Sequence, residues 1–244
     1  MASSSQPPTS PHKLRLPTAC GRLVLVSPVV PQHDQHVKDL YESPSTRKFI
    51  RGLPAVWPIE TITAQRLKRA ANPTNLDFAI HLVPSQSPIS PSDDFESLGP
   101  FVGVCNLTVN PLNSSAQAGI YICSSSQSQH YASEALHTLL SAGFSKGEGG
   151  AKLHRISFET AEDNVQMRGW MEKTLGVPKE YVHREAWVDT DGFLDLIGYS
   201  ILEQEWSGEK GLGEKLRVKV QEKVDESKRK EGSEESARQT PLAT

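Results

Sequence analysis

The chain has 244 residues, of which 36% are hydrophobic and 23% charged, and its formal net charge is −3. This composition is typical of one globular domain with polar ends, and it gives no reason to expect binding to nucleic acid. No apolar run approaches the roughly 18–20 residues that span a bilayer, and three separated cysteines without metal-ligand spacing indicate a reducing compartment.

The N-terminal residues carry little hydrophobic sequence. Residues 1–18 are rich in Ser and Pro, so we expect a disordered tail. This segment lacks the apolar core of a secretory signal. We therefore expect a cytoplasmic protein, with a nuclear location left open, that binds no metal, no nucleic acid and no membrane.

The main domain, which we expect to span residues 19–206, opens with a strand and two helices. Gly21–Val26 predicts the strand, because it is short and apolar. Pro31–Tyr41 predicts the first helix, which ends before Ser43-Pro44, since a residue that precedes proline disfavours the helical region. Ile59–Ala71 predicts the second helix.

Three strands then build an antiparallel meander. Asp77–Val83 alternates apolar and polar side chains, which is typical of a half-buried strand. Pro84–Pro100 is rich in Ser, Pro and Asp and should loop out. Phe101–Val109 predicts the next strand, and a hairpin turn at Asn110–Ser115 leads into the central strand, Gly119–Cys123.

A polar loop and a helix follow the central strand. The loop, Ser124–His130, contains no acidic or basic residue other than its histidine, and the helix, Tyr131–Lys146, carries one apolar stripe. The first N–H groups of a helix have no partner within it, so this end of the helix suits an anion such as a pyrophosphate. An ordinary strand-to-helix connection would look the same. Glu134, in the first turn, is interpreted as a complement to the helix dipole.

The rest of the domain contains a strand, a helix and a hairpin. Leu153–Thr160 predicts the fifth strand, and Asn164 or Asp163 is suited to cap the next helix. That helix has a core stripe made of Met167, Trp170, Met171 and Leu175. Glu180–Trp187 and Leu194–Leu202 predict the closing hairpin.

The C-terminal part of the chain is rich in Lys and Glu. Residues 207–230 predict a charged helix, in which Leu212, Leu216, Val220 and Val224 recur every four residues. Because this stripe is thin, we expect a solvated or loosely docked helix. Residues 231–244 should be a disordered tail.

Three motifs resemble the GNAT superfamily of N-acetyltransferases, and within it the RimJ/RimL-type branch that acetylates ribosomal-protein N-termini. The first is Gln127-Ser128-Gln129-His130-Tyr131-Ala132, which is similar to the family's coenzyme A pyrophosphate loop. The others are 159–164, similar to the family's second motif, and 183–202, similar to the closing signature of the branch. His130 and Ser128 stand where the family commonly has glycine.

The resemblance implies an α+β fold. Its central, mostly antiparallel sheet would have about seven strands, flanked by about four helices. One neighbouring pair would be parallel, namely the central strand and the strand at 153–160, and would splay apart just past Tyr121. The gap would admit the pantetheine arm of acetyl-CoA.

The resemblance also implies the residues that contact the coenzyme. Ile120 and Ile122 would offer backbone groups, with the Ile122 N–H near the thioester carbonyl. Asn164 would steady the pantetheine arm and is counted with the catalytic residues. The implied coenzyme-binding residues are Ile120, Ile122, Gln127, Ser128, Gln129, His130, Tyr131, Ala132 and Asn164.

An amine attacks a thioester only when it is neutral, so the site needs a group that accepts a proton. The candidates are Glu159 on the fifth strand, Glu185 near the closing hairpin, and His130 in the loop. Some members of the family carry a tyrosine that protonates the leaving thiolate. This chain has Met171 at that position, so the proton would come from water or from the acceptor.

We therefore expect an enzyme, a monomer or homodimer, that transfers an acetyl group from acetyl-CoA directly to a primary amine. The amine would belong to a small molecule or to a peptide or protein N-terminus. Two alternatives stay open. One is a catalytically degenerate protein that binds acyl-CoA as a scaffold, and the other is an acyltransferase that uses another acceptor or acyl chain.

Overall fold

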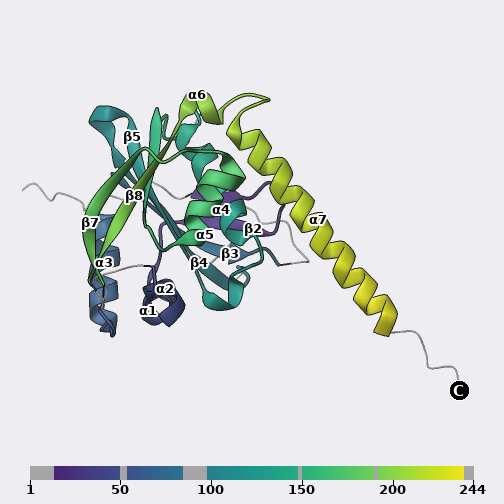
Figure 1. The fold of residues 1–244 in the computed structure, drawn as a ribbon. Coiled ribbons are helices and arrows are strands. Elements are labelled where there is room, and N and C mark those ends of the chain that lie inside the picture. The colour runs from purple at the N-terminus through teal and green to yellow at the C-terminus, as the bar shows by residue number, and fades with distance from the viewer. Residues whose placement is uncertain (1–13, 50–53, 85–97, 148–149, 190–191, 239–244) are drawn as a thin grey trace, which may run out of the picture.

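The protein, seen here as a computed structural model, is built on one eight-stranded sheet with the strand order β1-β2-β3-β4-β5-β6-β8-β7 (Figure 1). The structure describes residues 14–49, 54–84, 98–147, 150–189 and 192–238, and for 231–238 the backbone only. The strands are β1 Leu14–Pro17, β2 Leu23–Ser27, β3 Asn75–Leu82, β4 Phe101–Asn110, β5 Ser115–Ile122, β6 Arg155–Ala161, β7 Tyr181–Asp189 and β8 Gly192–Leu202.

Helices cover the sheet on both faces. They are α1 Asp34–Glu42, α2 Pro44–Arg47, α3 Ile59–Ala70, α4 Tyr131–Phe144, α5 Val165–Gly169, α6 Glu203–Trp206 and α7 Leu212–Arg238, with a π-helical turn, η5, at Trp170–Leu175. The mixed α/β fold expected from the sequence is confirmed. The helices expected at 31–41 and 59–71 correspond to α1, preceded by the 3-10 turn η1 Pro31–His33, and to α3.

The two faces of the sheet are distinguished by alternate residues of each strand. On β3, Phe78 and Ile80 belong to the same buried cluster as Leu136 and Leu140 of α4. Asp77 directly precedes Phe78, so its side chain lies on the opposite face, where it bonds to Arg69 of α3. Helix α4 therefore covers one face of the central strands, and the α1–α3 region covers the other.

Strands β5 and β6 form the only parallel pair among the described strands, and they are joined over three residue pairs alone: Ser115–Arg155, Ala116–Ile156 and Gln117–Ser157. Residues 118–122 of β5 pair with β4 but not with β6. The expected splayed pair is therefore present. It opens after Gln117, four residues earlier than Tyr121, the position implied by the resemblance.

The N-terminal expectation needs a correction. Residues 14–17, assigned to a disordered tail, form the edge strand β1 and pair antiparallel with β2. Leu14 and Leu16 alternate with polar neighbours and pack on the core, which explains the order. This strand raises the number from about seven to eight. Residues 1–13 of the expected tail lie outside the described residues.

The C-terminal helix also differs from the expectation. It extends to Arg238, so residues 231–238 are helical rather than part of a tail, while 239–244 lie outside the described residues. It is not loosely docked, because Leu216, Val220 and Val224 are buried in the main core. Figure 1 shows α7 running beside α4 and continuing past the sheet. No helix in the described part of the chain combines the length and apolar character needed to cross a bilayer.

Candidate active site

A cavity of about 580 Å³ opens at the gap between β5 and β6. Its wall is formed mainly by strands β3–β6 and by the α1–α3 side of the molecule, with further residues from β2, from the loop before α4, from the start of α5 and from β7. The lining residues used below are Tyr41, Tyr121, Gln127, Glu159, Asn164 and Trp187. The cavity therefore lies between the splayed strands and helices α1–α3, which cover the face of the sheet opposite to α4.

Backbone groups of β5 point into the gap. Cys123 donates its N–H to Val102 O on β4 (2.9 Å), and the direction of backbone groups alternates along a strand. Hence the N–H and C=O groups of Ile120 and Ile122 point the other way, toward β6. Only the carbonyl of Ile122 has a described partner there, because Gln127 Nε2 donates to it at 3.1 Å. These groups are oriented as a coenzyme arm would need.

The loop before α4 keeps a glycine-like backbone without glycine. Ser128 and His130 have φ of 63° and 64°, in the left-handed region that glycine adopts most easily. They are the two positions where the resembling family commonly has glycine. Within the described residues, the N–H groups of residues 128–133 have no hydrogen-bond acceptor. The His130 side chain is exposed and makes no hydrogen bond to the N–H groups at this end of the helix.

An ion pair ties this loop to the start of the domain. Glu134 is 2% exposed and accepts hydrogen bonds from Thr18 Oγ1 and from Arg22 Nε (2.9 Å), with Arg22 Nη2 at 2.7 Å. Arg22 Nη2 also donates to Gln129 O (3.2 Å), and the guanidinium lies over the Tyr131 ring. Glu134 thus anchors an arginine beneath the loop, which the sequence interpretation of Glu134 missed.

Asn164 caps helix α5. Its Oδ1 accepts from Met167 N (3.2 Å) and its Nδ2 donates to Thr160 Oγ1 (2.9 Å). The residue also lines the cavity, so the cap and a role beside the gap are compatible. Met171, at the position of the family's acid, is 0% exposed in the core.

Glu159 lies on the cavity wall and is held from two strands. Gln117 Nε2 of β5 donates to its Oε2 (2.7 Å), and the Tyr181 hydroxyl of β7 donates to its Oε1 (2.6 Å). No cation pairs with this carboxylate within the described residues. Tyr181 was not identified from the sequence, because it approaches from a strand two positions away in the sheet.

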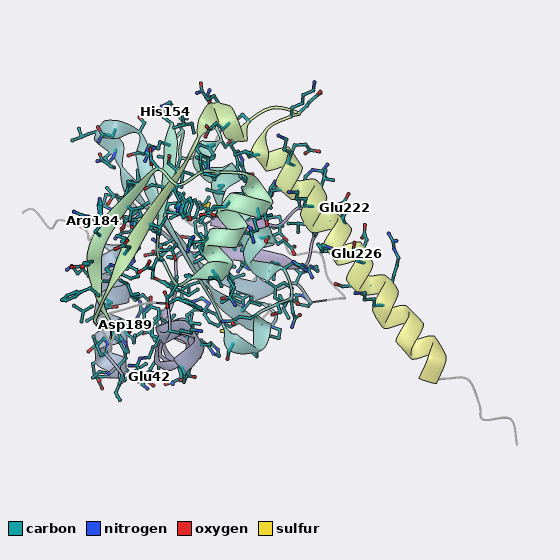
Figure 2. The ribbon with its side chains drawn as sticks, in the orientation of Figure 1. Glu42, His154, Arg184, Asp189, Glu222 and Glu226 are labelled. Atoms are coloured by element: carbon teal, nitrogen blue, oxygen red, sulfur yellow. The ribbon has the colours of Figure 1, made fainter. Side chains whose placement is uncertain are left out.

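Glu185 lies elsewhere. It sits in a bulge of β7 between His183 and Trp187, with φ of 52°, and its N–H donates to Asp195 Oδ1 (2.8 Å). It is exposed and does not line the cavity. Its neighbour Arg184 lies on the outer side of β7 in Figure 2. The bulge brings Trp187 to the cavity instead.

Aromatic rings and paired charges also line the cavity. The Tyr41 and Tyr121 rings meet edge to face at 5.9 Å, and burial raises the pKa of Tyr41 to about 12. Arg69 Nη2 lies 2.6 Å from Asp77 Oδ1. The described residues bring no three His, Cys, Asp or Glu side chains together as metal ligands.

The model of the acetyltransferase (GNAT) domain matches residues 22–174 of this sequence. The chain belongs to the GNAT family. The matched range begins at Arg22 and includes the loop, the splayed strands and Asn164. No curated protein gives a significant match to the sequence.

Solved structures with the same fold are numerous and distant in sequence. Mycobacterium smegmatis RimJ in complex with CoA-disulfide is 17% identical, with a TM-score of 0.64, over 85% of this chain and 94% of its own. Vibrio cholerae spermidine N-acetyltransferase, in complex with CoA and spermine, is 16% identical, with a TM-score of 0.62, over 75% and 96%. A GNAT-family acetyltransferase from Bacillus anthracis is 21% identical, with a TM-score of 0.60, over 79% and 100%. At these identities the likeness establishes the fold.

Proposed function

We propose that this GNAT protein is an acetyl-CoA-dependent N-acetyltransferase that transfers the acetyl group directly to a primary amine. The observation that carries the proposal is the position of Glu159, a carboxylate without a cation partner among the described residues, on the wall of the cavity into which the free backbone groups of β5 point. A proton acceptor and a binding position suited to a thioester thus lie in the same cavity.

The residues present fit acetyl-CoA. The loop N–H groups of residues 128–133, with the positive end of α4 and the nearby Arg22 guanidinium, suit a pyrophosphate. The pantetheine arm carries amides, and the backbone of Ile120 and Ile122 offers the donors and acceptors that would pair with them. Bound there, acetyl-CoA supplies the activated acetyl thioester.

The chemistry follows from these groups. The acceptor enters as an ammonium ion and gives one proton to the Glu159 carboxylate, and the neutral nitrogen then attacks the thioester carbonyl. An N–H directed into the gap, such as that of Ile122, stabilises the oxyanion that forms. When the carbon–sulfur bond breaks, the thiolate takes the remaining excess proton of the nitrogen. Met171 takes no part, because it is buried in the core.

A covalent acetyl-enzyme is not required. Cys105 lines the cavity but is 1% exposed, and burial raises the pKa of its thiol, so it stays protonated. Burial also raises the pKa of Cys123. Neither cysteine has the exposed, electropositive setting of a nucleophile.

The cavity favours a cationic acceptor. Asp34 and Asp77 are neutralised by Arg66 and Arg69, whereas Glu159 has no such partner within the described chain. The aromatic rings on the wall, Tyr41, Tyr121 and Trp187, can face an ammonium ion. The relative that binds spermine supports the same chemistry by analogy. A RimJ/RimL-type activity on protein N-termini, in a cytoplasmic monomer or homodimer, belongs to the same proposal.

The test is turnover of acetyl-CoA with a panel of polyamines, small amines and peptides, measured as free thiol. Glu159→Gln should lower kcat/KM by about 10²–10⁴-fold, the usual contribution of a general base. Glu185→Gln is the matched comparison and should retain activity. Retained activity in Glu159→Gln, or its loss only in Glu185→Gln, would overturn the assignment.

The second candidate is a non-catalytic acyl-CoA-binding protein. Methionine at position 171 favours it, because a thioether cannot donate the proton that a tyrosine at this position supplies in some members of the family. Calorimetry separates the two candidates. Binding of acetyl-CoA without thiol release for any acceptor would support the scaffold. Release with hydroxyl acceptors or longer acyl chains alone would support the other acyltransferase.

A further inference from the structure

Glu159, Gly198 and Tyr181 lie in one line across three strands. Glu159 of β6 is opposite Gly198 of β8, and Gly198 is opposite Tyr181 of β7. Side chains that are paired in this way lie on the same face of the sheet. Neighbouring strands are about 4.8 Å apart, so β6 and β7 are separated here by roughly twice that distance.

The absence of a side chain at Gly198 allows the outer two residues to meet. The Tyr181 ring lies directly over Gly198, and a methyl group at position 198 would overlap the ring. With the ring flat on the sheet, the hydroxyl reaches Glu159 Oε1 at 2.6 Å. Any larger residue at 198 would lift the ring and break this contact.

The two donors hold the carboxylate from opposite sides. Tyr181 of β7 donates a hydrogen bond to Oε1 of Glu159, and Gln117 of β5 donates one to Oε2. A carboxylate has about four acceptor sites, so both oxygens keep capacity for an incoming ammonium group. Burial and the neighbouring Glu159 raise the pKa of Tyr181 to about 12, so the phenol remains a donor at neutral pH.

We propose that Tyr181 is a positioning residue for Glu159, and that Gly198 is required because it lets the Tyr181 ring cross β8. The inference rests on the proposed function, in which Glu159 accepts the proton of the amine. Other groups face this site as well. Arg155 and Glu180 pair with each other (2.5 Å), and the His183 ring lies tilted against the Tyr181 ring, with the ring centroids 4.7 Å apart.

The test compares Tyr181→Phe and Gly198→Ala with Tyr199→Phe. Tyr199 also donates to a carboxylate, Glu172 (2.7 Å), but it lies in the core on the other face of the sheet. Tyr181→Phe and Gly198→Ala should lower kcat by about tenfold, the usual effect of one hydrogen bond to a charged group, with KM for acetyl-CoA unchanged. Tyr199→Phe should keep kcat. Equal kcat in Tyr181→Phe and the wild type would overturn the proposal.

A second measurement does not depend on turnover. The chemical shift of the Glu159 side-chain carboxyl carbon, assigned by its loss in Glu159→Gln, is recorded by NMR at one neutral pH. Because this chemical shift depends on the hydrogen bonds that the carboxylate accepts, it should change in Tyr181→Phe and stay the same in Tyr199→Phe. An unchanged chemical shift in Tyr181→Phe overturns the positioning role. A changed chemical shift in Tyr181→Phe, together with a wild type that shows no turnover, would leave the positioning intact and refute the proposed function.

Discussion

Replacing Glu134 by Gln should destabilise the protein and weaken its hold on acetyl-CoA. Glu134 is 2% exposed and faces Thr18 Oγ1 and three nitrogens of Arg22, namely the backbone N–H and two of the guanidinium, and the Arg22 side chain is 22% exposed. A neutral amide removes the countercharge and turns one acceptor into a donor that faces other donors.

The magnitude follows from the burial. Removing one partner of a buried ion pair costs about 3–5 kcal/mol, and the lower end applies because Arg22 is partly solvated. A loss of about 3 kcal/mol corresponds to a fall in Tm of roughly 6–12 °C for a domain of this size. Freed from Glu134, Arg22 would also hold Gln129 O less firmly. A loss of about 1 kcal/mol there weakens acetyl-CoA binding about fivefold.

Urea unfolding and calorimetric titration with acetyl-CoA measure the two effects. Glu214→Gln is the matched control, because its pair with Arg217 is exposed and should contribute less than about 1 kcal/mol. If Glu134→Gln unfolds at the same urea concentration as the wild type, the reasoning about the buried pair is wrong. If stability falls while acetyl-CoA affinity is kept, the pair does not support the loop.

Three further predictions concern stability. Burial, with His81 as the next cause, lowers the pKa of His33 to about 3, so the unfolded chain takes up a proton below pH 6.5 that the folded chain does not. The free energy of unfolding should therefore decrease by about 2 kcal/mol as the pH falls from 8 to 5. Urea unfolding measures it, and a His33→Asn variant whose free energy of unfolding depends on pH as steeply as that of the wild type would refute this. Leu216→Ala in α7 should cost about 2–4 kcal/mol, whereas the exposed Val218→Ala should not, and equal denaturation midpoints would show that α7 is not docked. Met171→Tyr should lower stability by about 1–3 kcal/mol through overpacking without raising kcat, and a rise in thiol release would contradict the mechanism.

The elements around the candidate site could be predicted because their signals are local. The strand, loop and helix at 119–144 follow from hydrophobic periodicity, and the Asn164 cap follows from one side chain and its own helix. Glu159 could be proposed as a candidate because it lies on β6, the fifth strand expected from the sequence, on the face opposite to the buried residues Ile156 and Phe158.

The arrangement around that glutamate could not be predicted, because it depends on contacts between distant parts of the chain. Tyr181 meets Glu159 only through the register of three strands and the missing side chain at Gly198. Arg22 meets Glu134 across 112 positions. Glu185 and Glu159 were equivalent candidates in the sequence. Glu185 lies in a bulge of β7 and away from the cavity, and the amino-acid composition around it does not reveal the bulge.

The docking of α7 was missed for a related reason. Its apolar stripe is thin, and the charged residues around it favour solvent. Leu216, Val220 and Val224 are buried because α7 packs against α4, η5 and α6 and joins the main core. The local sequence of α7 carries no information about packing against another helix.

The short junction between β5 and β6 has a consequence for how the protein is maintained in the cell. Three residue pairs join strands β1–β5 to strands β6–β8, so a coenzyme bound in the gap would add contacts between these two parts of the sheet. The free energy of unfolding then rises with the logarithm of the coenzyme concentration once this exceeds the Kd. We expect the lifetime of the protein to follow acetyl-CoA supply, so that starved cells would retain less of it than well-fed ones.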